Sequence, residues 1–245
     1  MASKADEAQD LTDLFTYFDS SRKQSPAPEI GQVVFTPVTN TDKKPQIADA
    51  TRSNPETHAK AEIVVRPAED KIDFLGKPGR LPIYAIHLGE TEEMVMTRAK
   101  KRPCVILAKT DGVNHQTLPA GTQQNKALNA FNTAYLLAPI YSVSTPDKAR
   151  SFGPVMTARI RGMMYPEFVF VPQSGGIIKH NGVIRLDRTF WSHMIGASQP
   201  QPLFLSNDIL GICWNQIRIL SNETPENEYM DLRELLLEYV PEDCK

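Results

Sequence analysis

Cysteine is scarce in this chain: Cys104, Cys213 and Cys244 are the only three among 245 residues. They lie far apart in the sequence, a spacing that matches neither a disulfide framework nor paired zinc knuckles. Their small number favours a reducing, cytoplasmic compartment over an oxidising one.

Long apolar runs are also missing. No segment approaches the roughly 20 apolar residues that a membrane-spanning helix requires. The first residues, MASKADEAQDLTDLF, lack the apolar core of a signal peptide. The sequence therefore predicts neither secretion nor a membrane partner.

Neither sign of charge is in clear excess, because 27 basic residues stand against 29 acidic ones. This balance excludes a protein that binds polyanions over its whole surface, so any contact with nucleic acid must come from a local basic patch. The motifs G-x-G-x-x-G, P-loop, H-E-x-x-H and G-x-S-x-G are absent. The familiar cofactor and hydrolase classes therefore have no support, and we predict no cofactor and no metal.

Helical periodicity occurs near both ends of the chain. In residues 8–19, Leu11, Leu14, Phe15 and Phe18 share one helical face, which either packs on its own domain or docks a partner. Amphipathic helices are also predicted over 205–220, with Ser206 as cap, and over 229–240. Shorter helices are expected over 122–131 and from Thr145 onward.

Strand patterns fill most of the remaining sequence. Residues 102–109 are apolar on both faces and predict a central strand. Residues 39–60 show no period and are expected to form a mobile loop. Further strands are predicted at 31–38, 61–66, 81–88, 93–98, 133–144, 167–172 and 182–190. Because no strand–helix–strand alternation persists, we predict a mainly β, α+β fold, either a small β-barrel or a strongly bent sheet with added helices.

The segment GVIRLDRTF, residues 182–190, combines apolar and charged side chains. As a strand it would place Arg185 and Asp187 on one face and Arg188 on the other. A carboxylate beside a guanidinium stays ionised, and the pair suits a phosphodiester: the carboxylate accepts a hydroxyl proton while the arginine neutralises phosphoryl oxygens. The alternative is an exposed ion pair that stabilises the fold by about 0–1 kcal/mol.

Other candidates stand at the ends of predicted strands. Arg102 follows Lys100 and Lys101 and leads into a central strand, where it would either hold phosphate or form a solvated strand end. Tyr141 and Ser142 end another buried strand with two hydroxyls, which either serve a site or satisfy local backbone groups.

Further candidate contacts to nucleic acid surround the Arg185 segment. Arg188 would contribute to a positive rim whose phosphate contacts depend on salt. Trp191 could stack on an unpaired base, whereas Phe190 is expected in the core. His193 either assists proton transfer or is an ordinary surface histidine.

Four of these segments, in this order, resemble the PemK/MazF-like (Kid-like) toxins of type II toxin–antitoxin systems. They are GQVVF, KKRPCVIL, LLAPIYS and GVIRLDRTF, and the predicted helix over 205–220 stands where that family has its closing helix. The similarity covers about half of the chain, namely 30–38, 100–109, 133–144 and 165–220. It implies an SH3-like small β-barrel of the PemK/MazF/CcdB type over 30–220, with an insertion at 39–100. The N-terminal helix and linker at 1–29 and the C-terminal helix at 221–245 are additions to that barrel.

The resemblance also implies an activity and partners. The family comprises sequence-selective, metal-independent endoribonucleases that leave a 2′,3′-cyclic phosphate on single-stranded RNA, commonly as homodimers neutralised by an antitoxin protein. Carried over by position, Asp187 would be the general base on the 2′-hydroxyl and Arg185 the general acid or phosphate stabiliser. Arg102 and Ser142 would position the scissile phosphate, and Tyr141, Lys101, Arg188, Trp191 and His193 would contact RNA.

The sequence departs from the family at one site residue and in several segments, including an excursion at 110–132 that is longer than usual. Tyr141 replaces the threonine that precedes the serine, which keeps a hydroxyl but moves it away from the strand, and the 39–100 insertion is much longer than the family loop. The leading alternative is therefore a non-catalytic module that binds nucleic acid or protein on the same barrel. A third hypothesis, a gyrase-poisoning protein on the same barrel, is disfavoured by the intact R-x-D segment.

Overall fold

The computed structural model describes residues 11–25, 27–51, 62–69, 71–75, 92–110, 133–143, 152–193 and 198–245. The chain divides into two compact units, residues 38–100 and the remainder (1–37 with 101–245). We call them the insert unit and the main unit. The elements predicted at 81–88 and 122–131 and directly after Thr145 lie outside the described residues.

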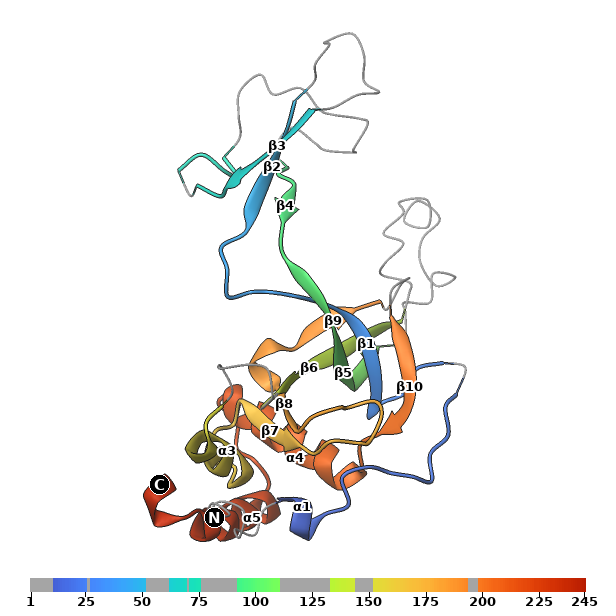
Figure 1. Cartoon of the computed structure of the whole chain (residues 1–245), viewed down its shortest axis with the longest axis vertical. Coiled ribbons are helices and arrows are strands. Elements are labelled where there is room, and N and C mark those ends of the chain that lie inside the picture. The colour runs from blue at the N-terminus through green and yellow to red at the C-terminus, as the bar shows by residue number, and fades with distance from the viewer. Residues whose placement is uncertain are drawn as a thin grey trace. The chain divides into compact units, whose positions relative to one another are not determined.

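The main unit is built on one seven-stranded sheet (Figure 1). Its strands run in the order β10-β1-β5-β6-β8-β7, and β9 also pairs with β6. The pairs with resolved register are antiparallel. The predicted α+β class is confirmed, and its sheets are mostly antiparallel. The described strands form no closed barrel, and the SH3-like barrel stays a prediction. The bounds are β1 (Gln32–Thr39), β5 (Ala99–Thr110), β6 (Ala134–Ser142), β7 (Phe168–Val171), β8 (Gly182–Arg185), β9 (Phe190–Ser192) and β10 (Gln199–Phe204).

Helices cover both faces of this sheet. On one face, α4 (Asn207–Leu220) and α5 (Asn227–Tyr239) join strand residues such as Val105, Ile140 and Ile184 in the largest core cluster. Each such aliphatic side chain stabilises the fold by roughly 1.5–3 kcal/mol through burial. On the other face, a smaller cluster forms around Phe170 and Val183, where α3 (Pro154–Arg161) contributes Ile160.

The start of α4 and the N-terminal helix are both fixed by local contacts in this core. The predicted cap of α4 is confirmed, because the Ser206 hydroxyl accepts a hydrogen bond from the Ile209 amide. In α1 (Leu11–Leu14), Leu11 is 1% exposed within the main core cluster. Phe15 and Phe18 pack against the same cluster, whereas Leu14 is 40% exposed, so most of the predicted apolar face packs on its own domain. The predicted helix over 8–19 is too long, because α1 ends at Leu14 and Phe18 forms a β-bridge with Leu205. None of the described helices combines the length and apolar composition needed to cross a bilayer.

Two buried thiols make the folding of the main unit measurable. Burial raises the pKa of Cys104 and Cys213 to about 12 from the ordinary 9.0. At about pH 8 this difference lowers the thiolate fraction roughly a thousandfold, and the thiolate is the reactive form. Because the unfolded chain ionises these thiols first, they reduce the stability of the native state as pH rises above about 9.

We therefore expect alkylation of Cys104 and Cys213 in the native protein to be at least about a hundredfold slower than in concentrated guanidinium chloride. Peptide mass mapping after timed exposure to iodoacetamide measures each site separately. Equal rates in the two conditions would show that the two thiols are not enclosed as described.

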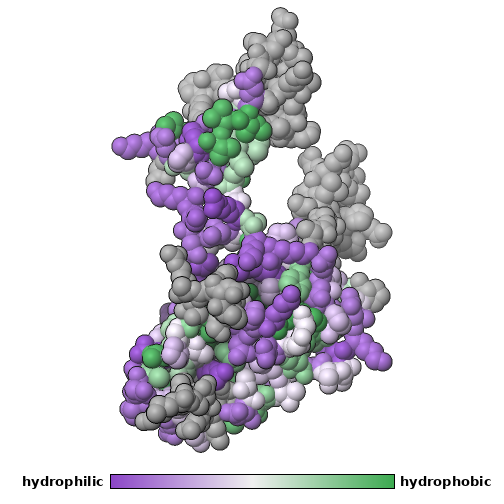
Figure 2. Space-filling model, viewed as in Figure 1, coloured by the Kyte–Doolittle hydropathy of each residue, from purple (hydrophilic) through white to green (hydrophobic). Residues whose placement is uncertain are grey.

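The insert unit contains a three-stranded sheet in the order β3-β2-β4. Its strands are β2 (Gln46–Thr51), β3 (Glu62–Pro67) and β4 (Val95–Met96). The prediction of an irregular loop over 39–60 is wrong at β2, because pairing on both sides organises this short segment and buries Ile47 and Ala48. On β3, the apolar residues Ile63 and Val64 remain 49% and 64% exposed. Figure 2 shows an apolar patch on the surface of this unit.

One arginine connects two acidic residues of this unit. The Arg66 guanidinium donates to both carboxylate oxygens of Asp73, at 2.9 and 2.5 Å, and also to Asp49. These bonds, those from Asp73 first, raise the pKa of Arg66 above its usual range. Asp73 is 4% exposed and also accepts from the Glu69 amide at 2.6 Å. A buried carboxylate in three hydrogen bonds fixes the turn after β3 to the sheet.

We expect Asp73→Asn to speed hydrogen exchange in β2 and β3 by about tenfold or more, because the substitution removes the more deeply buried of the two carboxylates that pair with Arg66. Peptide-level exchange measured by mass spectrometry reports this directly. The matched control is Glu62→Gln, an exposed carboxylate on β3 of the same unit. Equal protection in both variants would contradict a structural role for the Arg66–Asp73 pair.

Candidate functional site

Strand register in the main unit aligns one row of residues across the sheet. Tyr141 on β6 pairs with Val183 on β8, and Val183 pairs in turn with Phe170 on β7. On the other side of β6, Cys104 of β5 pairs with Pro139. Because the two strands are antiparallel, the same register extended by two residues places Arg102 of β5 opposite Tyr141. Paired residues lie on the same face of a sheet. The row therefore places Arg102 and Tyr141 together.

Gly182 permits the close approach of β8 to β6 at this point. It pairs with Ser142, and a Cβ atom at Gly182 would lie 2.9 Å from the Tyr141 carbonyl oxygen and 3.0 Å from an Ile140 methyl. Any other residue would push the two strands apart. Glycine at the start of β8 thus brings the charged end of that strand next to Tyr141.

Three guanidinium groups surround the ring of Tyr141. The central guanidinium carbon lies 4.2 Å from the ring centroid for Arg102, 5.7 Å for Arg185 and 5.6 Å for Arg188. These separations are those of cation–π contacts, which hold each cation over the ring without neutralising it. We call Arg102, Tyr141, Arg185, Asp187 and Arg188 the arginine–tyrosine cluster.

Asp187 supplies the carboxylate of the arginine–tyrosine cluster. It accepts from Arg185 at both oxygens, 2.7 Å from Nε and 2.5 Å from Nη2, while Nε of Arg188 lies 3.9 Å away. Its side chain is 31% exposed, against 17% for Arg185 and 18% for Arg188. Three arginines and one aspartate give the cluster a formal charge of +2. A half-buried group of this charge favours binding of a phosphate-bearing ligand.

A short helical turn produces this arrangement, and it corrects the prediction of one continuous strand over 182–190. β8 ends at Arg185, and a 3₁₀ turn, η5, spans Leu186–Arg188 before β9 begins at Phe190. In a 3₁₀ turn, side chains three residues apart lie on the same side. Arg185 and Arg188 therefore both face Tyr141, whereas strand alternation had put Arg188 on the opposite face.

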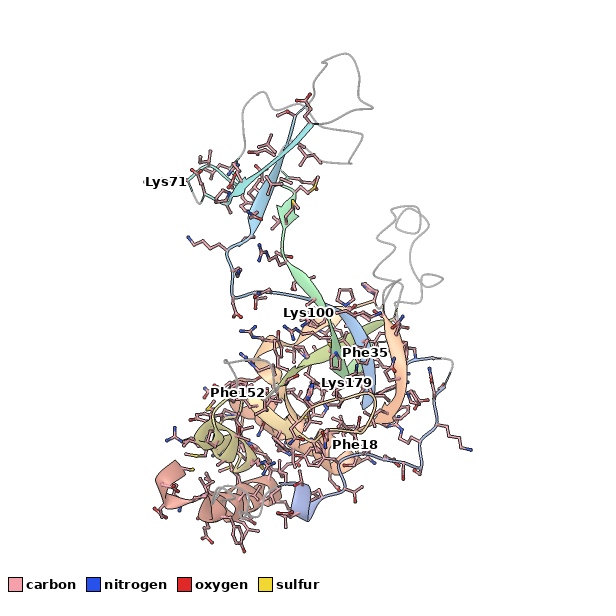
Figure 3. All side chains as sticks on the ribbon, viewed as in Figure 1. Phe18, Phe35, Lys71, Lys100, Phe152 and Lys179 are labelled. Atoms are coloured by element: carbon pink, nitrogen blue, oxygen red, sulfur yellow. The ribbon has the colours of Figure 1, made fainter. Side chains whose placement is uncertain are left out.

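Phe168 is a supporting residue that the sequence alone did not reveal. It pairs with Arg185 across β7 and β8, and its ring centroid lies 4.9 Å from the Arg185 guanidinium carbon. Phe152 and Tyr165 contact Phe168 edge-on, at centroid distances of 5.8 and 6.1 Å (Phe152 is labelled in Figure 3). Arg185 is thus held between an aromatic surface and Asp187. Only the strand register identifies this contact.

Ser142 and Lys101 lie next to the cluster along the chain but on the other face. Ser142 follows Tyr141 on β6, and Lys101 precedes Arg102 on β5. Adjacent residues in a strand point to opposite faces of the sheet. Both are exposed. The structure does not bring the predicted serine to the guanidinium groups.

Trp191 and His193 are likewise not joined to the cluster. Trp191 pairs with Leu136 of β6, which lies on the face opposite Tyr141, and it is 54% exposed. His193 follows β9, and its Nδ1 atom is buried with no hydrogen-bond partner in the part of the chain that the structure describes. The structure therefore unites four of the predicted residues with Tyr141 and leaves Ser142, Lys101, Trp191 and His193 outside.

The cluster provides the chemical groups for holding a phosphodiester: guanidinium donors, an aromatic ring and one carboxylate. A search against protein-family models found no match, and a search of curated proteins found none either.

Proposed function

We propose that this protein binds single-stranded RNA at the arginine–tyrosine cluster and cleaves it without a metal ion. The observation that carries the proposal is the convergence of Arg102, Arg185 and Arg188 on the ring of Tyr141 beside a carboxylate. Planar guanidinium groups match phosphate oxygens in charge and shape. The resemblance of four segments to the PemK/MazF-like toxins supports RNA as the phosphate-bearing ligand.

In the proposed reaction, Asp187 accepts the proton of a ribose 2′-hydroxyl as that oxygen attacks the adjacent phosphorus. The bond from phosphorus to the 5′-oxygen breaks, which leaves a 2′,3′-cyclic phosphate and a 5′-hydroxyl that takes a proton from solvent. Negative charge grows on the phosphoryl oxygens in the transition state. Fixed guanidinium groups at 102, 185 and 188 stabilise that charge.

Binding of the phosphate also prepares the carboxylate. Both Asp187 oxygens accept hydrogen bonds from Arg185 before RNA binds. A phosphate that takes one of the Arg185 donors leaves one Asp187 oxygen available to the 2′-hydroxyl. Substrate binding and formation of the base are thus coupled through one arginine.

The same contacts favour a second function, RNA binding without cleavage. Arg185 engages both oxygens of Asp187, and the Tyr141 ring occupies the centre of the cluster where the toxin family has threonine. If phosphate does not displace the Asp187–Arg185 pair, the site holds RNA and leaves it intact. The proposal also includes an SH3-like barrel topology, a homodimer and an antitoxin partner, because the resemblance to the toxin family implies all three.

One experiment separates the two functions. Purified full-length protein is incubated with a mixed-sequence single-stranded RNA in EDTA, and fragment ends are identified by mass spectrometry. We expect fragments that end in 2′,3′-cyclic phosphate. Saturable binding of RNA that stays intact at every salt concentration would establish the non-catalytic function, and the absence of binding would refute both.

A further inference from the structure

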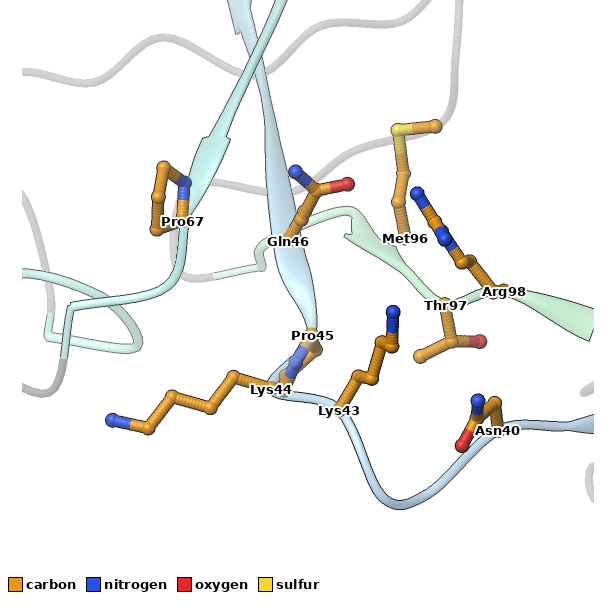
Figure 4. A pocket seen from close by; sticks show the side chains of 9 residues that line it. All are labelled: Asn40, Lys43, Lys44, Pro45, Gln46, Pro67, Met96, Thr97 and Arg98. Atoms are coloured by element: carbon orange, nitrogen blue, oxygen red, sulfur yellow. The ribbon is translucent and has the colours of Figure 1, made fainter. Parts of the chain in front are cut away.

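A second concave, basic site lies within the insert unit. It has a volume of about 340 Å³, comparable to small ligand pockets in proteins. It opens between the segment that leads into β2 and the segment from β4 to β5 (Figure 4). Its lining residues are Asn40, Lys43, Lys44, Pro45, Gln46, Pro67, Met96, Thr97 and Arg98.

Backbone pairing holds the walls of this pocket in place. Gln46 pairs with Pro67 of β3 on one side and with Met96 of β4 on the other. The Asn40 amide donates to the Arg98 carbonyl at 2.7 Å, which joins the loop before β2 to the strand segment opposite it. The pocket is therefore a part of the folded insert unit and does not require a ligand to bring its walls together.

The lining combines cations, neutral donors and apolar groups. Lys43, Lys44 and Arg98 carry positive charge, and no aspartate or glutamate occurs among these nine described residues. Figure 4 shows Lys43 and Arg98 extending into the space between the two segments, whereas Lys44 extends away from it. Pro45, Pro67 and Met96 supply apolar surface. Such a site suits a ligand with an anionic end and a flat, weakly polar body.

We propose that this pocket binds one nucleotide of single-stranded RNA, with its phosphate against Lys43 and Arg98 and its base against the proline and methionine side chains. The inference rests on the proposed function for the identity of the ligand. It adds a second, separate phosphate contact to the one at the arginine–tyrosine cluster. An inorganic anion would contact the cations alone and leave the proline and methionine side chains uncovered.

The test is RNA binding by the full-length protein, measured as fluorescence anisotropy of a labelled mixed-sequence RNA oligonucleotide over a range of salt concentrations. We expect the double variant Lys43→Ala/Arg98→Ala to bind about tenfold more weakly or worse. Loss of two phosphate contacts should lower the slope of log affinity against log salt by about 1.4, at roughly 0.7 for each contact on a single strand. The matched control is Lys71→Ala, an exposed lysine of the same unit outside the pocket, labelled in Figure 3.

Further outcomes separate this inference from the proposed function. If the double variant binds like the Lys71→Ala control while Arg102→Ala binds weakly, the pocket inference fails and the RNA site of the main unit stands. The reverse pattern would support the pocket and refute the main site. Competition by adenosine monophosphate that exceeds competition by inorganic phosphate supports nucleotide binding, and equal competition overturns it. A wild-type protein that does not bind RNA overturns both proposals.

Discussion

Asp187→Asn should reduce RNA cleavage by about 10²–10⁴-fold, the usual contribution of a positioned general base. The amide cannot accept the 2′-hydroxyl proton, while the three guanidinium groups around Tyr141 remain. RNA binding should not weaken, because the substitution removes the one negative charge of the arginine–tyrosine cluster. Initial rates with a fluorogenic RNA and anisotropy at equilibrium measure the two effects separately.

The fold should tolerate this substitution. The Asp187–Arg185 pair is partly exposed, and such pairs stabilise proteins by only about 0–1 kcal/mol. Asp231→Asn on α5 is the matched control, since it removes an exposed carboxylate far along the chain from the cluster. Cleavage by Asp187→Asn at the wild-type rate would exclude Asp187 as the base.

Arg102→Ala should weaken RNA binding by about ten- to a hundredfold, as expected for the loss of one hydrogen-bonded contact to a charged group. Arg102 has the shortest distance to the Tyr141 ring among the three arginines and, in contrast to Arg185, is not engaged by Asp187. The slope of log affinity against log salt should fall by about 0.7, because one phosphate contact is lost.

The control for this variant is Arg218→Ala, which removes an exposed arginine on α4 that pairs with Glu226. Both variants lower the net charge by the same amount, so a general electrostatic effect would weaken binding equally. Equal affinity of the two variants, whether reduced or not, would contradict a specific role for Arg102.

The sequence predicted the elements of the main unit better than it predicted the site. Apolar runs identified β5 and β6, and Ser206 identified the start of α4, because burial and capping are local signals. The charged segment around Arg185 was also identified, from the spacing of its charges. β10 was not predicted, since its sequence QPQPLF has little strand propensity and is ordered by pairing with β1.

The sequence could not predict which charged residues meet. The contact of Arg188 with Tyr141 depends on a 3₁₀ turn where the pattern indicated a strand, and the contact of Phe168 with Arg185 depends on register. Ser142 was assigned to the site by family position, yet alternation along β6 puts it on the opposite face from Tyr141. Local pattern predicted most elements of the main unit, whereas register and turn type determine which side chains share a surface.

The row from Arg102 to Phe170 joins residues from four strands that are distant in the sequence. During translation, the ribosome releases Arg102 and Tyr141 well before Arg185 and Arg188. Until β8 pairs with β6, Arg185 and Arg188 cannot converge with Arg102 on the Tyr141 ring, so the arginine–tyrosine cluster is not assembled in the nascent chain. Under the proposed function, the protein would therefore be made in an inert form beside the RNA that encodes it, and it would acquire its binding face only after most of the main sheet has left the ribosome.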